Sequence, residues 1–309
     1  MAEFIKKQSY FVTPTGSNIR GIGNEGLQTF YALTKNPDKN SKIIPRSDVE
    51  YFLSVPPEKY TFTLFTNTFS NRHDRKNNKI IKSKYETNDI VVLKPGDYFN
   101  TKEIVTTLGR LFYNKIIIDA CGMKDTIGYI NDELTKKNFN SVEKNIASNI
   151  TENKIFTSQM IKYINHRDWI GYQFYAVICS SFTSRTINLP KEVVNRKKEL
   201  LKKYEKEIKA GDPKVTENIE KELVSLTEKI LEDDPGMDFF KSGSKVSTGN
   251  NLKNIIIMRG AVMNPITGEY DIITNSFLDG MEKEKFNAHS NALILGAYPK
   301  ACGGVCASC

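Results

Sequence analysis

The feature that most constrains the fold is a pair of amphipathic stripes in the second half of the chain, separated by a Gly-Asp-Pro triplet. Pro190 suits the first turn of a helix. The apolar residues that follow it recur at helical spacing on one face and are Val194, Leu201, Tyr204 and Ile208. A second stripe follows the triplet and consists of Val215, Ile219, Leu223, Leu226 and Ile230. Because the positions between the apolar residues of each stripe are heavily charged, the pattern predicts two long amphipathic helices.

The residues between the stripes indicate how the two helices are joined. Gly211 is expected to end the first helix, because glycine tolerates the left-handed backbone of a helix terminus. Asp212 suits the cap of the second helix and Pro213 its first turn. Helices joined by so short a turn pack antiparallel. The narrow stripes therefore predict a coiled-coil-like hairpin over residues 190–235 that protrudes from the rest of the fold.

The first hundred residues carry β signals among irregular sequence, so residues 1–100 are predicted to form a mixed β and irregular region. Residues 60–65 alternate and are rich in aromatic and β-branched types, which favours a strand. Residues 90–93 predict a second strand, followed by a turn at residues 94–97. The charged, Asn-rich loop around residues 72–75 would then project between the two strands as the tip of a hairpin.

Residues 101–189 have a more helical character and are predicted to form a helical core region. Short helices are expected within residues 126–149 and 155–164. The apolar residues 116–118 predict either a strand or the buried end of a helix. Residues 169–179 are dense in aromatic side chains and almost uncharged, so they are expected to lie in the core rather than to stack on bases.

A loop of small residues begins the next region, residues 236–272. Its small residues are Ser242, Gly243, Ser244, Ser247, Thr248 and Gly249. Small residues let the backbone approach another surface closely, and Lys245 and Lys253 are candidates to face phosphate groups there. The loop lacks the Gly-Lys-Ser/Thr spacing of a P-loop, so an ordinary surface linker is the alternative. Residues 251–257 are expected to form one or two helical turns.

The last region, residues 273–309, is predicted to contain a helix over residues 275–295, capped by its first or second residue. Gly280 and Gly296 would each cost about 1 kcal/mol relative to alanine in a helix interior. Glycines in such a helix favour close approach of a partner or bending, and a poorly formed surface helix is the alternative.

Three cysteines close the chain, namely Cys302, Cys306 and Cys309. Thiolates this close together suggest part of a zinc site, but a closed structural site takes four ligands. His289 is a possible fourth ligand, although it falls in the predicted helix, and another chain could supply one instead. An unstructured, redox-sensitive terminus is the alternative. The histidines of the chain, His73, His166 and His289, have no ligand-like spacing.

The charge balance favours a polyanionic partner. Lys and Arg number 44 against 36 Asp and Glu, a formal net charge of +8, which favours DNA, RNA or nucleotides. A basic surface that only confers solubility is the alternative. No apolar run is long enough to span a membrane, and the first residues lack the apolar core of a signal peptide. Cys121 and Cys179 stand alone in apolar sequence, as reduced buried thiols do, so the chain is expected to be intracellular.

Taken in order, these segments resemble consecutive landmarks of the largest (beta-prime) subunit of cellular RNA polymerases. A Thr-Thr-x-Gly-Arg motif comes first in that family and is matched here by Thr106, Thr107, Gly109 and Arg110. The charged helix pair resembles the family's hairpin at the rim of the secondary channel. Residues 242–260, which end in Met-Arg-Gly, resemble the F-loop, and residues 273–280 are similar to the start of the bridge helix. The likeness covers about residues 101–296.

The resemblance implies an α+β fold, mostly helical and irregular, that is a fragment of a polymerase subunit. The F-loop residues expected to support nucleotide addition are Ser242, Gly243, Lys245, Ser247, Lys253 and Arg259. The residues expected in the bridge-helix-like segment are Phe277, Gly280, Met281 and Gly296. No catalytic residue is expected in this chain, because it lacks the aspartate cluster with which that family holds catalytic magnesium.

The resemblance also implies a place in a larger assembly. The chain would be the middle piece of a split beta-prime-like subunit, as in jumbo bacteriophages. It would act in a DNA-directed RNA polymerase, a nucleotidyltransferase, only together with other beta-prime-like and beta-like chains, DNA template and RNA. Another chain would bind the Mg²⁺, no membrane would be involved, and the complex would work in the host cytoplasm or be packaged in the virion. The alternatives are a basic, non-enzymatic nucleic-acid-binding or structural phage protein, and a thiol or zinc protein.

Overall fold

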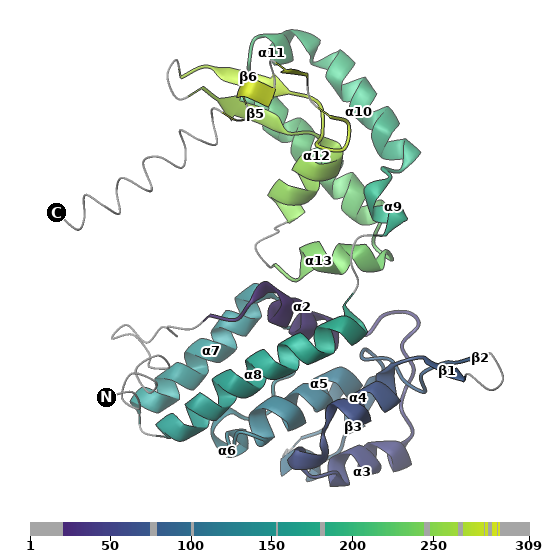
Figure 1. The fold of residues 1–309 in the computed structure, drawn as a ribbon, viewed down its shortest axis with the longest axis vertical. Helices are drawn as coiled ribbons and strands as arrows, with labels where there is room; N and C mark the ends of the chain where they lie inside the picture. Colours follow the sequence, from purple (N-terminus) through teal and green to yellow (C-terminus); the bar gives the residue numbers. More distant parts are fainter. Residues whose placement is uncertain are drawn as a thin grey trace. The chain divides into compact units, whose positions relative to one another are not determined.

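The computed structural model describes residues 21–74, 79–99, 102–152, 154–179, 183–243, 248–264, 268–280, 282–283, 286–288 and 290. This part of the chain has the α+β, mostly helical character that the sequence predicts, with small two-stranded sheets. The chain divides into two compact units (Figure 1). Unit 1 comprises residues 1–179 and 242–244, and unit 2 comprises residues 180–241 and 245–309. Each unit has its own apolar core.

Helices, rather than strands, dominate the beginning of unit 1. They are α2 (Asn24–Leu33), α3 (Arg46–Ser54), the 3-10 turn η1 (Pro57–Lys59) and α4 (Phe62–Phe69). The strand predicted over residues 60–65 is therefore wrong. The Thr61 hydroxyl accepts a hydrogen bond from the Leu64 amide, which caps α4. The helix buries Phe65 against Phe174, with ring centroids 3.7 Å apart, and this tertiary contact overrides the local β preference.

Two antiparallel strand pairs follow. Strand β1 (Arg72–Asp74) pairs with β2 (Lys79–Ile81), and β3 (Ile90–Leu93) pairs with β4 (Ile104–Thr107). The strand predicted at residues 90–93 is confirmed. The loop expected at residues 72–75 is wrong in that residues 72–74 form strand β1, which pairs with β2. The 3-10 turn η2 (Asp97–Phe99) lies between β3 and β4.

The rest of unit 1 is helical, as expected. It contains α5 (Leu108–Tyr113), the π-helix η3 (Asn114–Asp119), α6 (Lys124–Ile127), α7 (Lys136–Thr151) and α8 (Thr157–Ile178). Helix α2 packs against α8 (Figure 1), and a Cβ at Gly171 would lie only 2.7 Å from the Cα of Gly26. The expectation that residues 169–179 are all core is wrong in part, since Trp169 is 62% exposed. One face of α8 is left uncovered within the unit.

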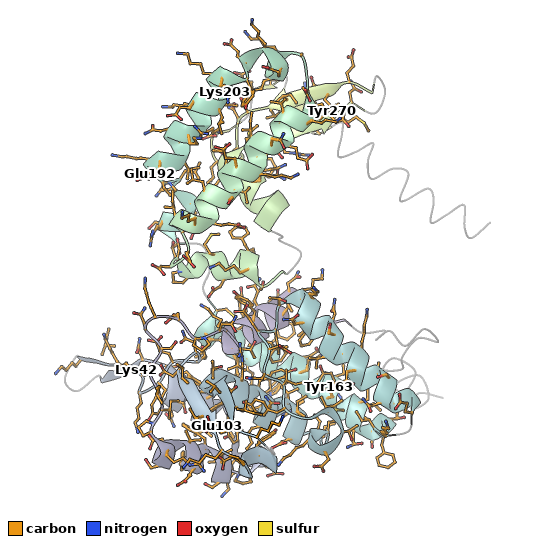
Figure 2. The ribbon with its side chains drawn as sticks, turned by 180° about the vertical axis from the view of Figure 1, so that it is seen from behind. Lys42, Glu103, Tyr163, Glu192, Lys203 and Tyr270 are labelled. Atoms are coloured by element: carbon orange, nitrogen blue, oxygen red, sulfur yellow. The ribbon has the colours of Figure 1, made fainter. Side chains whose placement is uncertain are left out.

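The predicted helix pair is present in unit 2. It consists of α10 (Lys191–Lys203), the short α11 (Glu205–Lys209) and α12 (Pro213–Ile230), and α10 and α12 run antiparallel (Figure 1). Gly211 has a φ of +75°, and the Asp212 carboxylate accepts a hydrogen bond from the Lys214 amide, as the sequence predicts. Long charged side chains such as Lys203 cover the outer surface of the pair, whereas Tyr163 lies inside unit 1 (Figure 2).

Helix α12 is nevertheless no isolated arm within unit 2. It packs against the π-helix η5 (Thr248–Ile257) and against the hairpin of β5 (Gly260–Met263) and β6 (Tyr270–Ile273). Shorter segments complete the unit: α9 (Ser184–Ile187), the 3-10 turn η4 (Pro235–Met237) and α13 (Asp238–Lys241). The shared core consists of Val193, Leu200, Ile219, Leu223, Leu231, Met237, Phe240, Ile256, Ile257 and Met258.

The helix predicted to begin at residue 275 starts later. Residues 277–279 form a turn, and Gly280 has a φ of +78°, which is incompatible with a helix interior. Among the described residues beyond it, positions 283, 286–288 and 290 are helical. Within the described part of the chain, no helix combines the length and the apolar character needed to cross a membrane.

Candidate functional site

The Met-Arg-Gly motif lies at a junction of three segments of unit 2. The Arg259 amide donates to the Asn275 carbonyl over 2.9 Å. The Phe277 amide donates to the Asn254 carbonyl of η5 over 2.9 Å, and the Leu278 amide to the next carbonyl of η5 over 3.1 Å. The Met-Arg-Gly motif and the segment that begins at Asn275 are therefore bonded to each other, and that segment is also bonded to η5.

A turn stabilised by its own side chains closes this junction. The Ser276 amide donates to the Asp279 carboxylate over 3.0 Å, and the Asp279 amide donates to the Ser276 hydroxyl over 3.0 Å. Lys197 of α10 donates to the Ile257 carbonyl over 2.6 Å and reaches Asp279 at 3.2 Å. Burial disfavours the Asp279 carboxylate, but the bonds from Ser276 and Lys197 outweigh it and lower the pKa of Asp279. The turn is thus fixed to the first helix of the pair.

A second lysine fixes the junction to α12. Lys253 Nζ lies 2.8 Å from Glu220 Oε2, and the two side chains are only 11% and 12% exposed. The other oxygen of Glu220, Oε1, has no hydrogen-bond partner among the described residues. Burial raises the pKa of Glu220, and the Lys253 ammonium opposes that rise. Burial also lowers the pKa of Arg259, which is half-buried beside the same carboxylate.

Gly260 allows Glu220 to occupy this position. Its φ is +79°, and a Cβ built there would lie 1.5 Å from Glu220 Oε1 and 2.7 Å from the carboxyl carbon. Only glycine accommodates both the left-handed backbone and the approach of the carboxylate. The sequence-based reasoning missed Glu220 and Lys197, because both look like ordinary members of charged helical faces. No local signal marks a pair whose members are separated by 33 residues.

The predicted F-loop residues belong to different units. Ser242 is fully buried in unit 1, where its carbonyl accepts a hydrogen bond from the Lys136 amide at the start of α7 over 2.9 Å. Gly243 follows it with a φ of +70°. Lys253 and Arg259 lie in unit 2 near Glu220, so Lys253 forms an internal ion pair instead of an open phosphate contact.

The predicted bridge-helix residues are described only in part. Phe277 is 45% exposed at the turn, and Gly280 follows it. The remaining site residues lie outside the described residues and are Lys245, Ser247, Met281, Gly296, Cys302, Cys306 and Cys309.

The Thr-Thr-x-Gly-Arg motif lies at the junction of β4 and α5 in unit 1. The Thr107 hydroxyl accepts from the Arg110 amide and caps α5. Gly109 lies so close to the Leu33 carbonyl that a Cβ would approach its oxygen to 1.8 Å. Arg110 is buried and donates from Nε to the Thr34 carbonyl over 3.0 Å. Each residue therefore has a structural task within this unit.

The side chains of the unit 2 junction hold backbone segments in place. Its two lysines are bonded to carboxylates and to a backbone carbonyl, an arrangement that fixes the backbone of residues 253–259 and 275–279. Across the described ranges, no group of three or more His, Cys, Asp or Glu side chains is arranged to hold a metal ion. Neither a protein-family model nor a curated protein matches this sequence.

Proposed function

We propose that this chain is a component of a multisubunit DNA-dependent RNA polymerase. In that complex it shapes the secondary channel and the active-site cleft, and it helps to position template and nucleotide. Catalysis of phosphoryl transfer is largely positioning and charge stabilisation, so a chain without magnesium ligands of its own has a role in it. Other chains of the complex bind the catalytic Mg²⁺ in this proposal.

The observation that carries the proposal is the hydrogen bond from the Arg259 amide to the Asn275 carbonyl. It joins the segment that resembles the F-loop to the segment that resembles the start of the bridge helix. Both also pack on the helix pair that resembles the channel rim, through Glu220 and Lys197. Met-Arg-Gly and the segment at residues 275–279 thus share unit 2 and its core with the helix pair, whereas Thr-Thr-x-Gly-Arg and Ser242 lie in unit 1.

A purification from the native source tests the proposal. The chain carries an affinity tag, and mass spectrometry identifies the chains that copurify with it. We expect a chain with an Asp-x-Asp-x-Asp magnesium motif and beta-like chains, in a complex that synthesises RNA from a DNA template. Recovery of the chain alone, or with chains that have no polymerase motifs, contradicts the proposal. DNA binding by the lone chain with a steep salt dependence would then favour the non-enzymatic alternative.

A matched pair of variants tests the role of the junction within such a complex. Gly260→Ala displaces Glu220, whereas Gly268→Ala changes a glycine of similar φ with open space around it. With equal amounts of assembled complex, we expect Gly260→Ala to slow nucleotide addition at least about tenfold, the effect of a misplaced positioning group. Gly268→Ala should leave the rate nearly unchanged. Equal rates for the two variants would count against a positioning role.

A further inference from the structure

The pocket beside Tyr98 in unit 1 brings together a buried lysine, a strained tyrosine and a π-helix. It is an open pocket of about 380 Å³ between α3, η2, η3 and α6, within the range of about 300–1,000 Å³ typical of small-molecule sites. Arg46, Lys115 and Lys124 line it, together with the carboxylates of Glu50 and Asp97. The distribution of these charges within the pocket indicates what it could hold.

Lys115 is the most unusual of the lining residues. Its side chain is only 9% exposed, and Nζ donates to the Leu53 carbonyl over 3.0 Å. The Asp119 carboxylate lies at 3.8 Å, beyond hydrogen-bond distance. Within the described part of the chain, one hydrogen bond therefore reaches an ammonium with three donors. Burial lowers the pKa of Lys115, and an anion in the pocket would offset that cost of burying the charge.

Tyr98 forms a wall of the pocket at the cost of backbone strain. It is the one non-glycine residue with positive φ in the described ranges, at +50°, a region that side chains with a Cβ disfavour. Its hydroxyl donates to Asp119 over 2.7 Å. Lys124 Nζ lies 4.5 Å from the ring centroid and Lys115 Nζ lies 5.6 Å from it. The strained residue thus lies beside two ammonium groups. Lys115 and Asp119 come from a π-helix, an element frequent at functional sites.

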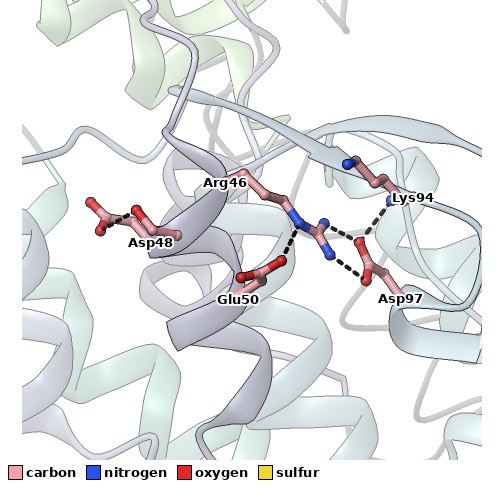
Figure 3. Close-up of polar contacts among 6 residues, drawn as sticks. Arg46, Asp48, Glu50, Lys94 and Asp97 are labelled. Carbon is pink, nitrogen blue, oxygen red and sulfur yellow. Dashed lines mark hydrogen bonds and ion pairs between the residues drawn. The ribbon is translucent and has the colours of Figure 1, made fainter.

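The acidic residues of the pocket are already paired (Figure 3). Arg46 donates from both terminal nitrogens to Asp97, one of these bonds being 2.9 Å long, and from Nε to Glu50 over 2.8 Å. The Lys94 amide also donates to Asp97 over 2.7 Å. Arg46 and its two carboxylates therefore form one closed group. Of the charged residues that line the pocket, the three cations Arg46, Lys115 and Lys124 outnumber the two carboxylates, so the lining favours a negative ligand.

We propose that this pocket binds a small anion that carries a phosphate group, seated against Lys115 and Lys124 with the Tyr98 ring as a wall. Lysine ammonium groups bind phosphate as point charges, and two of them line this pocket. The source of the phosphate group is either free phosphate or pyrophosphate, or a nucleotide. The inference does not rest on the proposed polymerase role, because the pocket lies wholly within unit 1.

Isothermal titration calorimetry on the full chain tests the proposal, with inorganic phosphate, pyrophosphate and ATP as three separate ligands. We expect saturable binding of at least one. Tighter binding of ATP identifies a nucleotide site, and tighter binding of phosphate or pyrophosphate identifies a site for the free anion. No saturable binding of any of the three at millimolar concentration overturns the proposal.

Charge-matched variants place the binding in the pocket. Lys124→Met removes a half-buried lysine at the pocket, and Lys144→Met removes one exposed charge on α7, away from the lining residues. We expect Lys124→Met to weaken affinity about tenfold or more and Lys144→Met less than about twofold, as loss of a charge-assisted contact predicts. Equal affinities for the two variants overturn the proposal. Protection of Lys124 from acylation by bound ligand, read by mass spectrometry on the unmodified sequence, checks the site without replacing a residue, and no protection also overturns the proposal.

Discussion

Position 260 requires glycine for two reasons, its positive φ and its contact with Glu220, whereas position 268 has the positive φ alone. Both Gly260 and Gly268 have positive φ, but only the first is in contact with a carboxylate. An alanine in the left-handed region costs about 1–2 kcal/mol, so we expect that loss from Gly268→Ala. Gly260→Ala must also displace Glu220 from Lys253, and we expect a loss of about 3 kcal/mol or more. Urea denaturation measures both, and equal losses would mean that Glu220 moves aside freely.

The second prediction at the residue scale concerns the ion pair of Glu220 and Lys253. Lys253→Met leaves a largely buried carboxylate without its partner, which costs about 3–5 kcal/mol. Burial raises the folded-state pKa of Glu220 above its ordinary value of 4.5. A carboxyl group whose pKa is higher in the folded than in the unfolded state stabilises the fold when it is protonated. This stabilisation is complete at pH values below the unfolded-state pKa and is lost as the pH rises through the folded-state pKa.

The destabilisation caused by Lys253→Met should therefore shrink as the pH is lowered from 7 toward about 4.5, the range in which a carboxyl with raised pKa gains its proton. Urea denaturation of wild type and variant at each pH gives the difference directly. The double variant Glu220→Gln/Lys253→Met serves as the control, because it lacks the titrating group. A loss that is independent of pH in the single variant would show that Glu220 is already solvated.

At the scale of elements, Asp234 joins the segments at the two ends of the helix pair. Its carboxylate, on a residue 2% exposed, accepts bonds from the Gly236 amide and from the hydroxyls of Thr183 and Thr186, all near 2.9 Å. Burial disfavours this carboxylate, but the three donors outweigh burial and lower the pKa of Asp234. The pair is therefore closed at its base by one side chain.

Replacing that side chain should loosen the base of the pair. Asp234→Ala is expected to cost about 2–4 kcal/mol, because it removes charge-assisted bonds and leaves buried donors unsatisfied. Asp233→Ala, at an exposed neighbour, should cost less than about 0.5 kcal/mol. Since the pKa of Asp234 is lowered, its contribution is present above the unfolded pKa and is lost as pH falls below about 4. Thermal unfolding at pH 7 and pH 3 measures both effects, and a deficit unchanged at pH 3 would contradict them.

The elements that the sequence predicted correctly are those with local determinants. The helix pair follows from its second apolar stripe and from Gly211 and Asp212, whose conformations and bonds are as expected. The first stripe was misplaced by one residue, because α10 buries Val193 and Leu200 instead of Val194 and Leu201. Residues 60–65 were misread, because alternation of apolar and polar residues fits a strand, whereas the Thr61 cap and the packing of Phe65 on Phe174 decide for a helix. The Asn-Ser pair at residues 275 and 276 resembles a helix cap, but Ser276 and Asp279 bond each other and form a turn instead.

The contacts that build the candidate site could not be predicted in this way. Glu220 and Lys253 come from separate elements, and nothing in either local pattern selects the other. The positive φ of Tyr98 could not be predicted from the sequence either, because tyrosine has no preference for positive φ. Site residues of this kind depend on tertiary packing, and a local pattern indicates at most which elements supply them.

At the scale of the whole molecule, the chain has two separate apolar cores. The last prediction is that each core stabilises only its own unit. The unit 2 core contains Leu223, and the unit 1 core contains Leu111; both are fully buried. Truncating either to alanine costs about 2–5 kcal/mol. If each core stabilises only its own unit, Leu223→Ala should speed amide exchange in α10, α12 and β5 but not in α8, and Leu111→Ala should do the reverse.

Hydrogen exchange followed by mass spectrometry reads peptides from both units in one experiment, so each variant contains its own internal control. Exchange that rises equally in both units for either variant would mean that the whole chain opens as one cooperative unit. The expected separation has a physical cause. The helix pair, η5 and the β5–β6 hairpin pack on one another, and the two cores share no residue, so opening one core leaves the apolar contacts within the other intact.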